Sequence, residues 1–336
     1  MAIRQLRLLH ASQEDPSKPV RVRAGAPLSE PGGDYEALHR QFKRLFNAKP
    51  GKGYGRFSED IGNHPVAAWL KDYLEGRQSF EGFSDELLSR WQDLIAQSEA
   101  EVDGPLLLVH EALADGEVIY LFALETDSTL RLDADLALET SDSISLSRLN
   151  LAARIEKDDW LGEHPGENYL TLIQARGTGE RGKQFAELVG FQSSVDVDAE
   201  TRTFMEAVES FAREAQPEQA QAVRARAYAF CQEQESMGEP VPLSALSGYL
   251  DENAPERFAR HAAESQSLNP DTVLHPDRRK VRKLVRLSGS GNGLSLSFSS
   301  DLVNQAVHYD AGKDALIITK LPKGLKEQLQ SYLDRD

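Results

Sequence analysis

Cysteine is almost absent from this sequence: Cys231 is the only one in 336 residues. A single thiol cannot form an internal disulfide, and together with eight scattered histidines it cannot build a Cys-rich zinc site. We therefore expect a reducing compartment and no structural metal.

Long hydrophobic runs are missing as well. The N-terminal stretch MAIRQLRLLHASQED has too short an apolar run for a signal peptide. No later stretch approaches the roughly 20 apolar residues of a membrane helix. We expect a cytosolic, soluble protein without a standard export signal, and the 40% of hydrophobic residues can still form a proper core.

Catalytic signatures are also lacking, because the chain has no HExxH, no GxSxG and no carboxylate pair whose spacing demands acid/base chemistry. Residues 177–184, GTGERGKQ, have the spacing of a phosphate-binding loop, with Gly177, Gly182 and Lys183. Gln184, however, stands where a Ser or Thr would bind magnesium. We favour a polar turn between a strand and a helix over an NTP-dependent enzyme, and we expect no catalytic residue, no cofactor and no metal.

A second glycine-rich run, GSGNG at residues 289–293, does not fit a dinucleotide-binding loop. Such a loop follows a strand and opens a helix, whereas this run opens the alternating segment LSLSFS, which is typical of a strand. We interpret the glycines as a tight or flexible turn into a sheet.

Charge is unevenly distributed along the chain. The formal net charge of −16 argues against nucleic acid, because a polyanion repels a polyanion. Residues 1–57, however, hold 11 Lys and Arg against 5 Asp and Glu, and residues 278–336 hold 11 against 6, while the interior is acidic. This segregation could present basic patches if the two ends meet, although a mosaic of charges is also an ordinary solubility device.

Two basic stretches are candidate nucleic-acid contacts. In the second, apolar residues alternate with the cations, so that a helix would leave a basic face free for phosphates, or merely a solvated face. In the first, glycines and the aromatics Tyr54 and Phe57 are interleaved with the cations, and the aromatics could stack on bases or simply fix the loop to its domain. The candidates are Lys43, Arg44, Lys49, Lys52 and Arg56 in the first stretch, and Arg278, Arg279, Lys280, Arg282, Lys283 and Arg286 in the second.

The hydrophobic periodicity predicts an α+β fold. Helices are expected from residue 34 to about residue 47, over residues 66–74 and from residue 84, followed by a β-hairpin over residues 105–125 and strands within residues 129–137, 144–155 and 169–175. Mainly helical sequence follows, then the basic stretch, a β-hairpin region and a final amphipathic helix. We place an N-terminal α+β domain at residues 1–178 and a mainly helical C-terminal domain at residues 179–336.

Several segments together resemble the NdpA/YejK family of roughly 37 kDa nucleoid-associated bacterial proteins. They are GYGRFSED at residues 53–60, RIEKDDW at 154–160 with YLTLIQARG after it, YAFCQEQ at 228–234, and GSGNGLSLSF at 289–298 with PKGLKEQLQ downstream. The resemblance covers nearly the whole chain and implies a location at the nucleoid, not a reaction.

Two binding functions follow as hypotheses. One is direct, largely non-specific binding of double-stranded DNA through the basic stretches, with an oligomer such as a homodimer doubling the patch. The other is an acidic adaptor that reaches the nucleoid by binding a DNA-processing enzyme, for example a type II topoisomerase. Neither involves a membrane.

Overall fold

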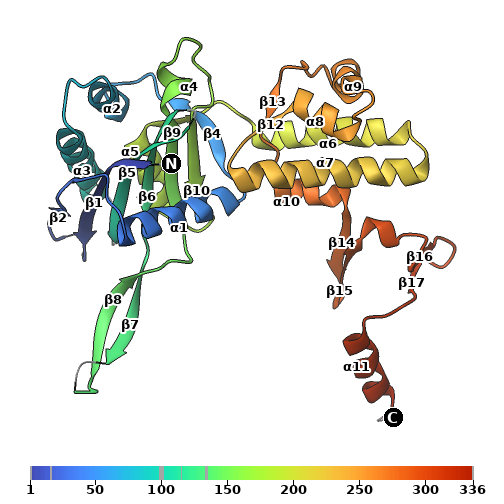
Figure 1. Cartoon of the computed structure of the whole chain (residues 1–336). Coiled ribbons are helices and arrows are strands. Elements are labelled where there is room, and N and C mark those ends of the chain that lie inside the picture. Colours follow the sequence, from blue (N-terminus) through green and yellow to red (C-terminus); the bar gives the residue numbers. More distant parts are fainter. Residues whose placement is uncertain (1, 16, 98–101, 115, 133–134, 335–336) are drawn as a thin grey trace. The chain divides into compact units, whose positions relative to one another are not determined.

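The structure is a computed structural model and describes residues 2–15, 17–97, 102–114, 116–132 and 135–334 (Figure 1). The chain forms two compact units. The first comprises Met1–Glu200 and Glu235–Glu239, and the second comprises Thr201–Gln234 and Pro240–Asp336.

A nine-stranded antiparallel sheet is the centre of the first unit. Its strands follow the order β11-β4-β10-β9-β6-β5-β1-β2, and the short β3 also pairs with β1. The predicted hairpin is confirmed as β5 and β6, although Asp115 in its turn lies outside the described residues. The strands are β1 (Ala2–Gln13), β2 (Arg21–Ala24), β3 (Leu28–Ser29), β4 (Gly53–Phe57), β5 (Val102–Ala112), β6 (Glu117–Ala123), β9 (Leu151–Glu156), β10 (Leu170–Gln174) and β11 (Phe191–Ser193).

Helices cover both faces of this sheet, because its central strands are apolar on both sides. Leu107 and Val109 of β5 belong to a core that contains Phe42 and Phe46 of α1. Leu106 and Leu108, which alternate with them along β5, belong to a second core that is shared with α2, α3 and α5. The helices of this unit are α1 (Asp34–Ala48), α2 (Val66–Leu74), α3 (Phe80–Ala96), the short α4 (Lys157–Leu161) and α5 (Gly179–Val189).

The predicted helices are confirmed with small shifts at their ends. α2 has the predicted bounds. α3 begins four residues earlier than expected, because the Ser79 hydroxyl accepts a hydrogen bond from the Gly82 amide at 3.0 Å and so caps the helix. At α1 the cap position belongs to Gly33 and not to Asp34.

A two-stranded arm, β7 (Thr126–Leu132) with β8 (Leu138–Ile144), pairs only within itself. The bounds of the strands predicted within residues 129–137 and 144–155 were wrong, because β7, β8 and β9 begin and end at other residues. The chain turns near Leu136, whose φ is 61°, and residues 145–150 form a connection before β9.

The core of the second unit is helical. Phe204 and Phe211 of α6 pack with Phe230 of α7 and Phe258 of α9. The elements around this core are α6 (Val197–Arg213), α7 (Pro217–Met237), β12 (Val241–Pro242), α8 (Leu243–Leu250), α9 (Arg257–Gln266) and β13 (Val273–Leu274). The chain continues through α10 (Arg278–Val281), the 3-10 turn η1 (Arg282–Leu284), β14 (Arg286–Gly291), β15 (Leu294–Ser299), the 3-10 turn η2 (Ser300–Leu302), β16 (Val307–Asp310), β17 (Ala315–Ile318) and α11 (Lys323–Leu333).

The α+β class is confirmed by this architecture. The N-terminal segment of the first unit extends to Glu200, whereas we placed the domain boundary after residue 178. The reason is packing: Phe185 and Leu188 of α5 complete the core on one face of the sheet, and β11 extends the sheet beside β4. Among the described residues, no helix combines the length and the apolar character needed to cross a bilayer.

Replacing Gly55 with alanine should lower the free energy of unfolding by about 2 kcal/mol, because overpacking against a rigid backbone is costly. A Cβ at this position of β4 would overlap the backbone carbonyl oxygen of Gln192 in β11. Urea unfolding followed by circular dichroism measures the effect. Gly32→Ala is the matched control, since its Cβ meets no atom within 4 Å. Equal stability of the two variants would contradict this packing.

Candidate nucleic-acid interface

The basic stretch of the second unit begins at a capped helix. The Asp277 carboxylate accepts a hydrogen bond from the Arg279 amide at 2.9 Å, and Val281 and Leu284 are buried in the helical core. The inward orientation predicted for the apolar residues is therefore confirmed. The helical segment ends at Leu284, however, and Arg286 starts strand β14.

The six cations of this stretch have different surroundings. Arg279 forms an ion pair with Asp277 at 3.3 Å, and Arg286 donates to the Ser297 hydroxyl at 2.9 Å. Arg278 and Lys280 are half-buried and have partners of their own. Arg282 and Lys283 are exposed, and within the described part of the chain they form no ion pair.

A surface hollow of about 810 Å³ lies beside Lys283. Its lining is rich in neutral polar groups, among them Ser300, Asn304 and Gln305. Arg224 also lines it, but this guanidinium is held by Glu209 through two hydrogen bonds of 2.9 Å. Asp301 is the other acidic residue of the lining. The hollow thus offers hydrogen-bonding groups next to an unpaired ammonium group.

Two of the five cations in the basic stretch of the first unit, Lys43 and Lys52, are turned inward. Lys43 lies on the side of α1 that faces the sheet, where its Nζ contacts the Glu111 carboxylate at 2.9 Å and lies 5.9 Å from the centre of the Tyr120 ring. Lys52 is only 7% exposed and donates to the Asn47 carbonyl at 2.9 Å. Burial lowers the pKa of Lys52 to about 8, and the same burial keeps its amino group out of reach of a phosphate in solvent.

The remaining cations of this stretch lie nearer the surface. Arg44 is exposed and donates to Gln41, while Lys49 is half-buried. Arg56 pairs with Glu59 at 3.3 Å. Tyr54 and Phe57 belong to strand β4, and Phe57 is buried against Trp160 and Tyr169, so this aromatic is part of the core.

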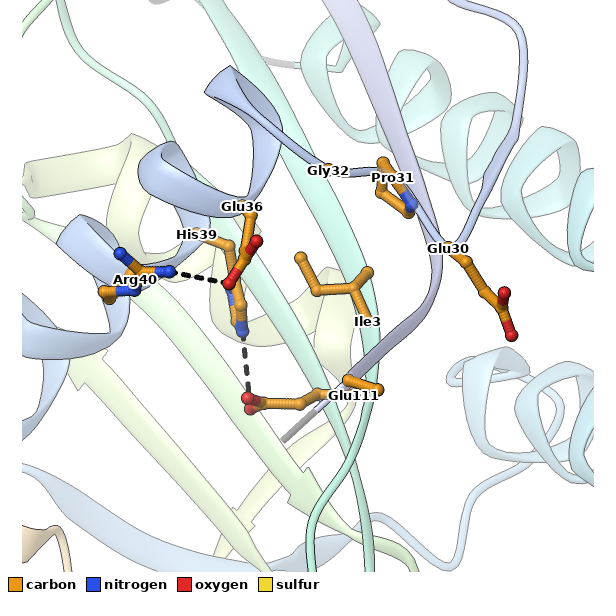
Figure 2. Close-up of a pocket in the computed structure, with 9 residues that line it drawn as sticks. Ile3, Glu30, Pro31, Gly32, Glu36, His39, Arg40 and Glu111 are labelled. Atoms are coloured by element: carbon orange, nitrogen blue, oxygen red, sulfur yellow. Dashed lines mark hydrogen bonds and ion pairs between the residues drawn. The ribbon is translucent and has the colours of Figure 1, made fainter.

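A pocket of about 390 Å³ lies above Glu111, between the start of β1 and the first turns of α1 (Figure 2). Figure 2 shows the His39 ring pointing from α1 to the Glu111 carboxylate, at 3.3 Å, and Arg40 paired with Glu36 at 2.6 Å. Glu30 also lines the pocket. Three carboxylates in one pocket disfavour a phosphate ligand.

Glu111 has no exposed surface and is held ionised by its neighbours. Burial raises the pKa of its carboxyl, but the hydrogen bonds and the charges of His39 and Lys43 outweigh this effect and bring the pKa below its ordinary value. Its second oxygen, Oε1, has no hydrogen-bond partner among the described residues. Lys43 therefore serves to neutralise a buried charge.

A second polar cluster was missed by the sequence analysis. The Tyr73 hydroxyl lies 2.7 Å from His110 Nδ1, and Glu117 contacts Arg4 at 2.6 Å and also pairs with Lys157. Burial lowers the pKa of His110 to about 4, so the ring is neutral at physiological pH. The signal in the sequence was the pair His110 and Glu111 at the end of an apolar strand, where each polar side chain needs a partner.

A turn at residues 175–178 connects β10 to α5, in agreement with the interpretation as a polar turn between a strand and a helix, and residues 179–183 of the glycine-rich run form the first turn of α5. β10 is antiparallel to both of its neighbours. The side chain of Gln184 is buried and donates to the Leu94 carbonyl at 2.9 Å, while the exposed Lys183 pairs with Glu180 at 3.3 Å. Within the described ranges, no three His, Cys, Asp or Glu side chains gather in a metal-binding arrangement.

Replacing Lys43 with methionine should lower the free energy of unfolding by about 3 kcal/mol, because it leaves the buried Glu111 charge without its closest cation. Urea unfolding at pH 7 measures the loss. The double variant Lys43→Met/Glu111→Gln removes both charges and should recover most of the stability. If the single variant is as stable as the original chain, the pair does not have this role.

Comparison with known proteins connects these features to a family. The family described as "Nucleoid-associated protein YejK" matches residues 8–326. A nucleoid-associated protein of Pseudomonas syringae pv. tomato is 32% identical over 298 residues, which cover 88% of this chain and 89% of the relative. Relatives with the same description occur in Pseudomonas putida, at 31% over 302 residues (89% and 90% covered), and in Azotobacter vinelandii, at 30% over 292 residues (86% of each).

The family match covers both compact units and all four of the segments on which the predicted resemblance was based. It includes the basic stretch of the second unit and the glycine-rich turn that follows it. The resemblance is therefore confirmed, and this chain belongs to the YejK family of nucleoid-associated proteins.

Proposed function

We propose that this protein acts in the cytoplasm, at the bacterial nucleoid, by binding double-stranded DNA largely without sequence preference, and without catalysing a reaction. The observation that supports the proposal is the pair Arg282 and Lys283, two exposed cations without an ion-pair partner in the described part of the chain. Unpaired exposed cations are the groups that exchange counterions with a phosphate backbone. Because both side chains are exposed, a contact with a phosphate at the surface costs little desolvation free energy.

The surroundings of Lys283 suit a phosphate contact. Ser300, Asn304 and Gln305 line the adjacent hollow, and their hydroxyl and amide groups can donate hydrogen bonds to phosphate oxygens. Such contacts position a duplex without reading its bases. Arg278, Arg279, Lys280 and Arg286 add positive potential around this point, although each of the four also has an intramolecular partner.

The first unit makes a smaller contribution in this proposal. Arg44, Lys49 and Arg56 are the members of its basic stretch that remain near the surface, while Lys43 and Lys52 serve the protein interior. The net charge of −16 keeps the affinity low, and the contacts between cations and phosphates make it decrease with salt. An oligomer would compensate by offering the same cations more than once.

The double variant Arg282→Glu/Lys283→Glu should weaken binding to duplex DNA by at least about 10-fold at about 50 mM salt and reduce the slope of log K against log salt by about 2. Fluorescence anisotropy over about 50 to 200 mM salt measures both quantities. The matched control is Lys71→Glu/Arg131→Glu, which changes the net charge equally at two other exposed cations. If both double variants bind alike, or if the original chain does not bind DNA at low salt, the proposal fails.

A second candidate function is favoured by the arm β7–β8. Leu130, Leu132 and Leu138 share one face of this hairpin, all exposed, and the acidic Asp142 lies further along the same face. An exposed apolar face with an acidic border is typical of a surface that binds a basic protein. In this alternative the chain is an adaptor for a DNA-processing enzyme such as a type II topoisomerase.

Leu132→Asp should then reduce binding to the purified type II topoisomerase of the same bacterium by about 10-fold, because it puts a charge in the centre of the apolar face. Ser141→Asp, on the opposite face of the arm, is the matched control. Biolayer interferometry after nuclease treatment measures both. Binding that needs DNA, or that is insensitive to Leu132→Asp, would exclude the arm as an adaptor surface.

A further inference from the structure

The hairpin β14–β15 has one apolar face, exposed or half-exposed along its length, that no element covers in the described part of the chain. Leu287 and Phe298 are directly opposite each other on this face, followed by Leu296 and Leu294 along β15. The partners of those two leucines in β14 are Gly289 and Gly291. A Cβ built at either glycine would meet no atom within 4 Å, so two of the three β14 positions on this face are open backbone.

Helix α11 is exposed on every side. Leu325, Leu329 and Leu333 recur every four residues and form one stripe, which Tyr332 widens. The exposed fractions of Tyr332 and Leu333 are 72% and 68%. The opposite face is polar, with Glu327 and Ser331. Figure 1 shows this helix as the last element of the chain.

Neither element is stable by itself in water. A two-stranded hairpin needs a further strand or a helix packed on it. A helix of 11 residues is below the length at which isolated helices persist, so it depends on packing of its apolar face. Each element therefore needs a surface of the kind that the other supplies.

The two surfaces match in size. The stripe from Leu325 to Leu333 extends over about 12 Å along the helix axis. The apolar run from Leu294 to Phe298 extends over about 13 Å along the strand. The open backbone at Gly289 and Gly291 lets a helix approach closely, as glycine does where two elements meet.

The connection to α11 opposes closure within one chain. Thr319 is fixed to the preceding segment, since its amide and its hydroxyl both donate to the Ala306 carbonyl, at 2.8 and 3.2 Å. Only Lys320, Leu321 and Pro322 then separate it from the helix, and Lys320 and Pro322 have constrained backbones. In the single chain the stripe of α11 accordingly stays exposed.

We propose that two copies of this chain form a symmetric dimer in which α11 of each copy packs on the apolar face of β14–β15 of the other. Each contact covers eight exposed or half-exposed apolar side chains, four from the hairpin and four from α11, and symmetry produces two contacts. At roughly 100 Å² for each side chain, the dimer buries on the order of 1,600 Å², which is the size of a standard specific interface. The dimer does not depend on DNA binding.

The oligomeric state of the full chain tests the proposal. Sedimentation equilibrium of nuclease-treated protein should give twice the chain mass of 37.3 kDa at about 10 μM. Leu325→Asp/Leu329→Asp should raise the dissociation constant at least about 100-fold, since it places two charges in the packed stripe. Ser331→Asp, on the polar face of the same helix, should change it less than about threefold.

Gly289→Val is a second variant that leaves the fold intact, because its side chain enters open space and valine favours strands. It should also break the dimer, by filling the gap that α11 needs. A monomeric original chain, or a dimer that withstands both the Leu325→Asp/Leu329→Asp and the Gly289→Val changes, would overturn the proposal.

Disulfide trapping identifies the occupant. One preparation carries Leu296→Cys and the other Leu329→Cys, while the native Cys231 is buried. Mixing them under mild oxidation should give a covalent heterodimer in high yield. An intramolecular disulfide in the doubly substituted chain at high dilution would instead show closure within one chain. The dimer would likewise be contradicted if the apolar stripe of α11 became shielded from solvent only when DNA or a topoisomerase is added.

Discussion

The burial of β5, β6 and β9 on both faces constrains the first unit more than any other feature. Residues of these strands alternate between two separate apolar cores, so helices must cover both sides of the sheet. α1 covers one face, and this placement turns part of a basic helix toward the interior. Lys43 is then needed to balance Glu111, which has no contact with solvent.

The same constraint explains why the two basic stretches differ. Lys43 of α1 and Lys52 after it lie over an apolar sheet. A charged group buried there must be paired, as Lys43 is, or its pKa shifts from the ordinary value, as that of Lys52 does. The stretch of the second unit is anchored by the buried Val281 and Leu284, with Val285 packed against the same core. Arg282 and Lys283 therefore face solvent, whereas Arg278 and Lys280 are half-buried and have partners of their own.

Periodicity in the sequence was sufficient to predict the α+β class, α2 and the β5–β6 hairpin, because each of these depends on local pattern. It was insufficient at Arg286, where the same basic and apolar alternation continues from a helix into a strand. The distinction comes from pairing with β15, which is a tertiary contact. Likewise the fate of Lys43 depended on Glu111, 68 residues away, and no local rule connects the two.

The chain leaves the first unit after Glu200 and returns to it for Glu235–Glu239. This short return is structurally necessary: the buried Arg154 donates to the Gly238 carbonyl at 3.0 Å, and Asn47 donates to the Met237 carbonyl at 3.2 Å. On the ribosome, therefore, the N-terminal sheet cannot reach its final state when its last strand emerges. Only after some forty further residues have been synthesised does Arg154, which already pairs with Glu156, gain the Gly238 carbonyl as an acceptor.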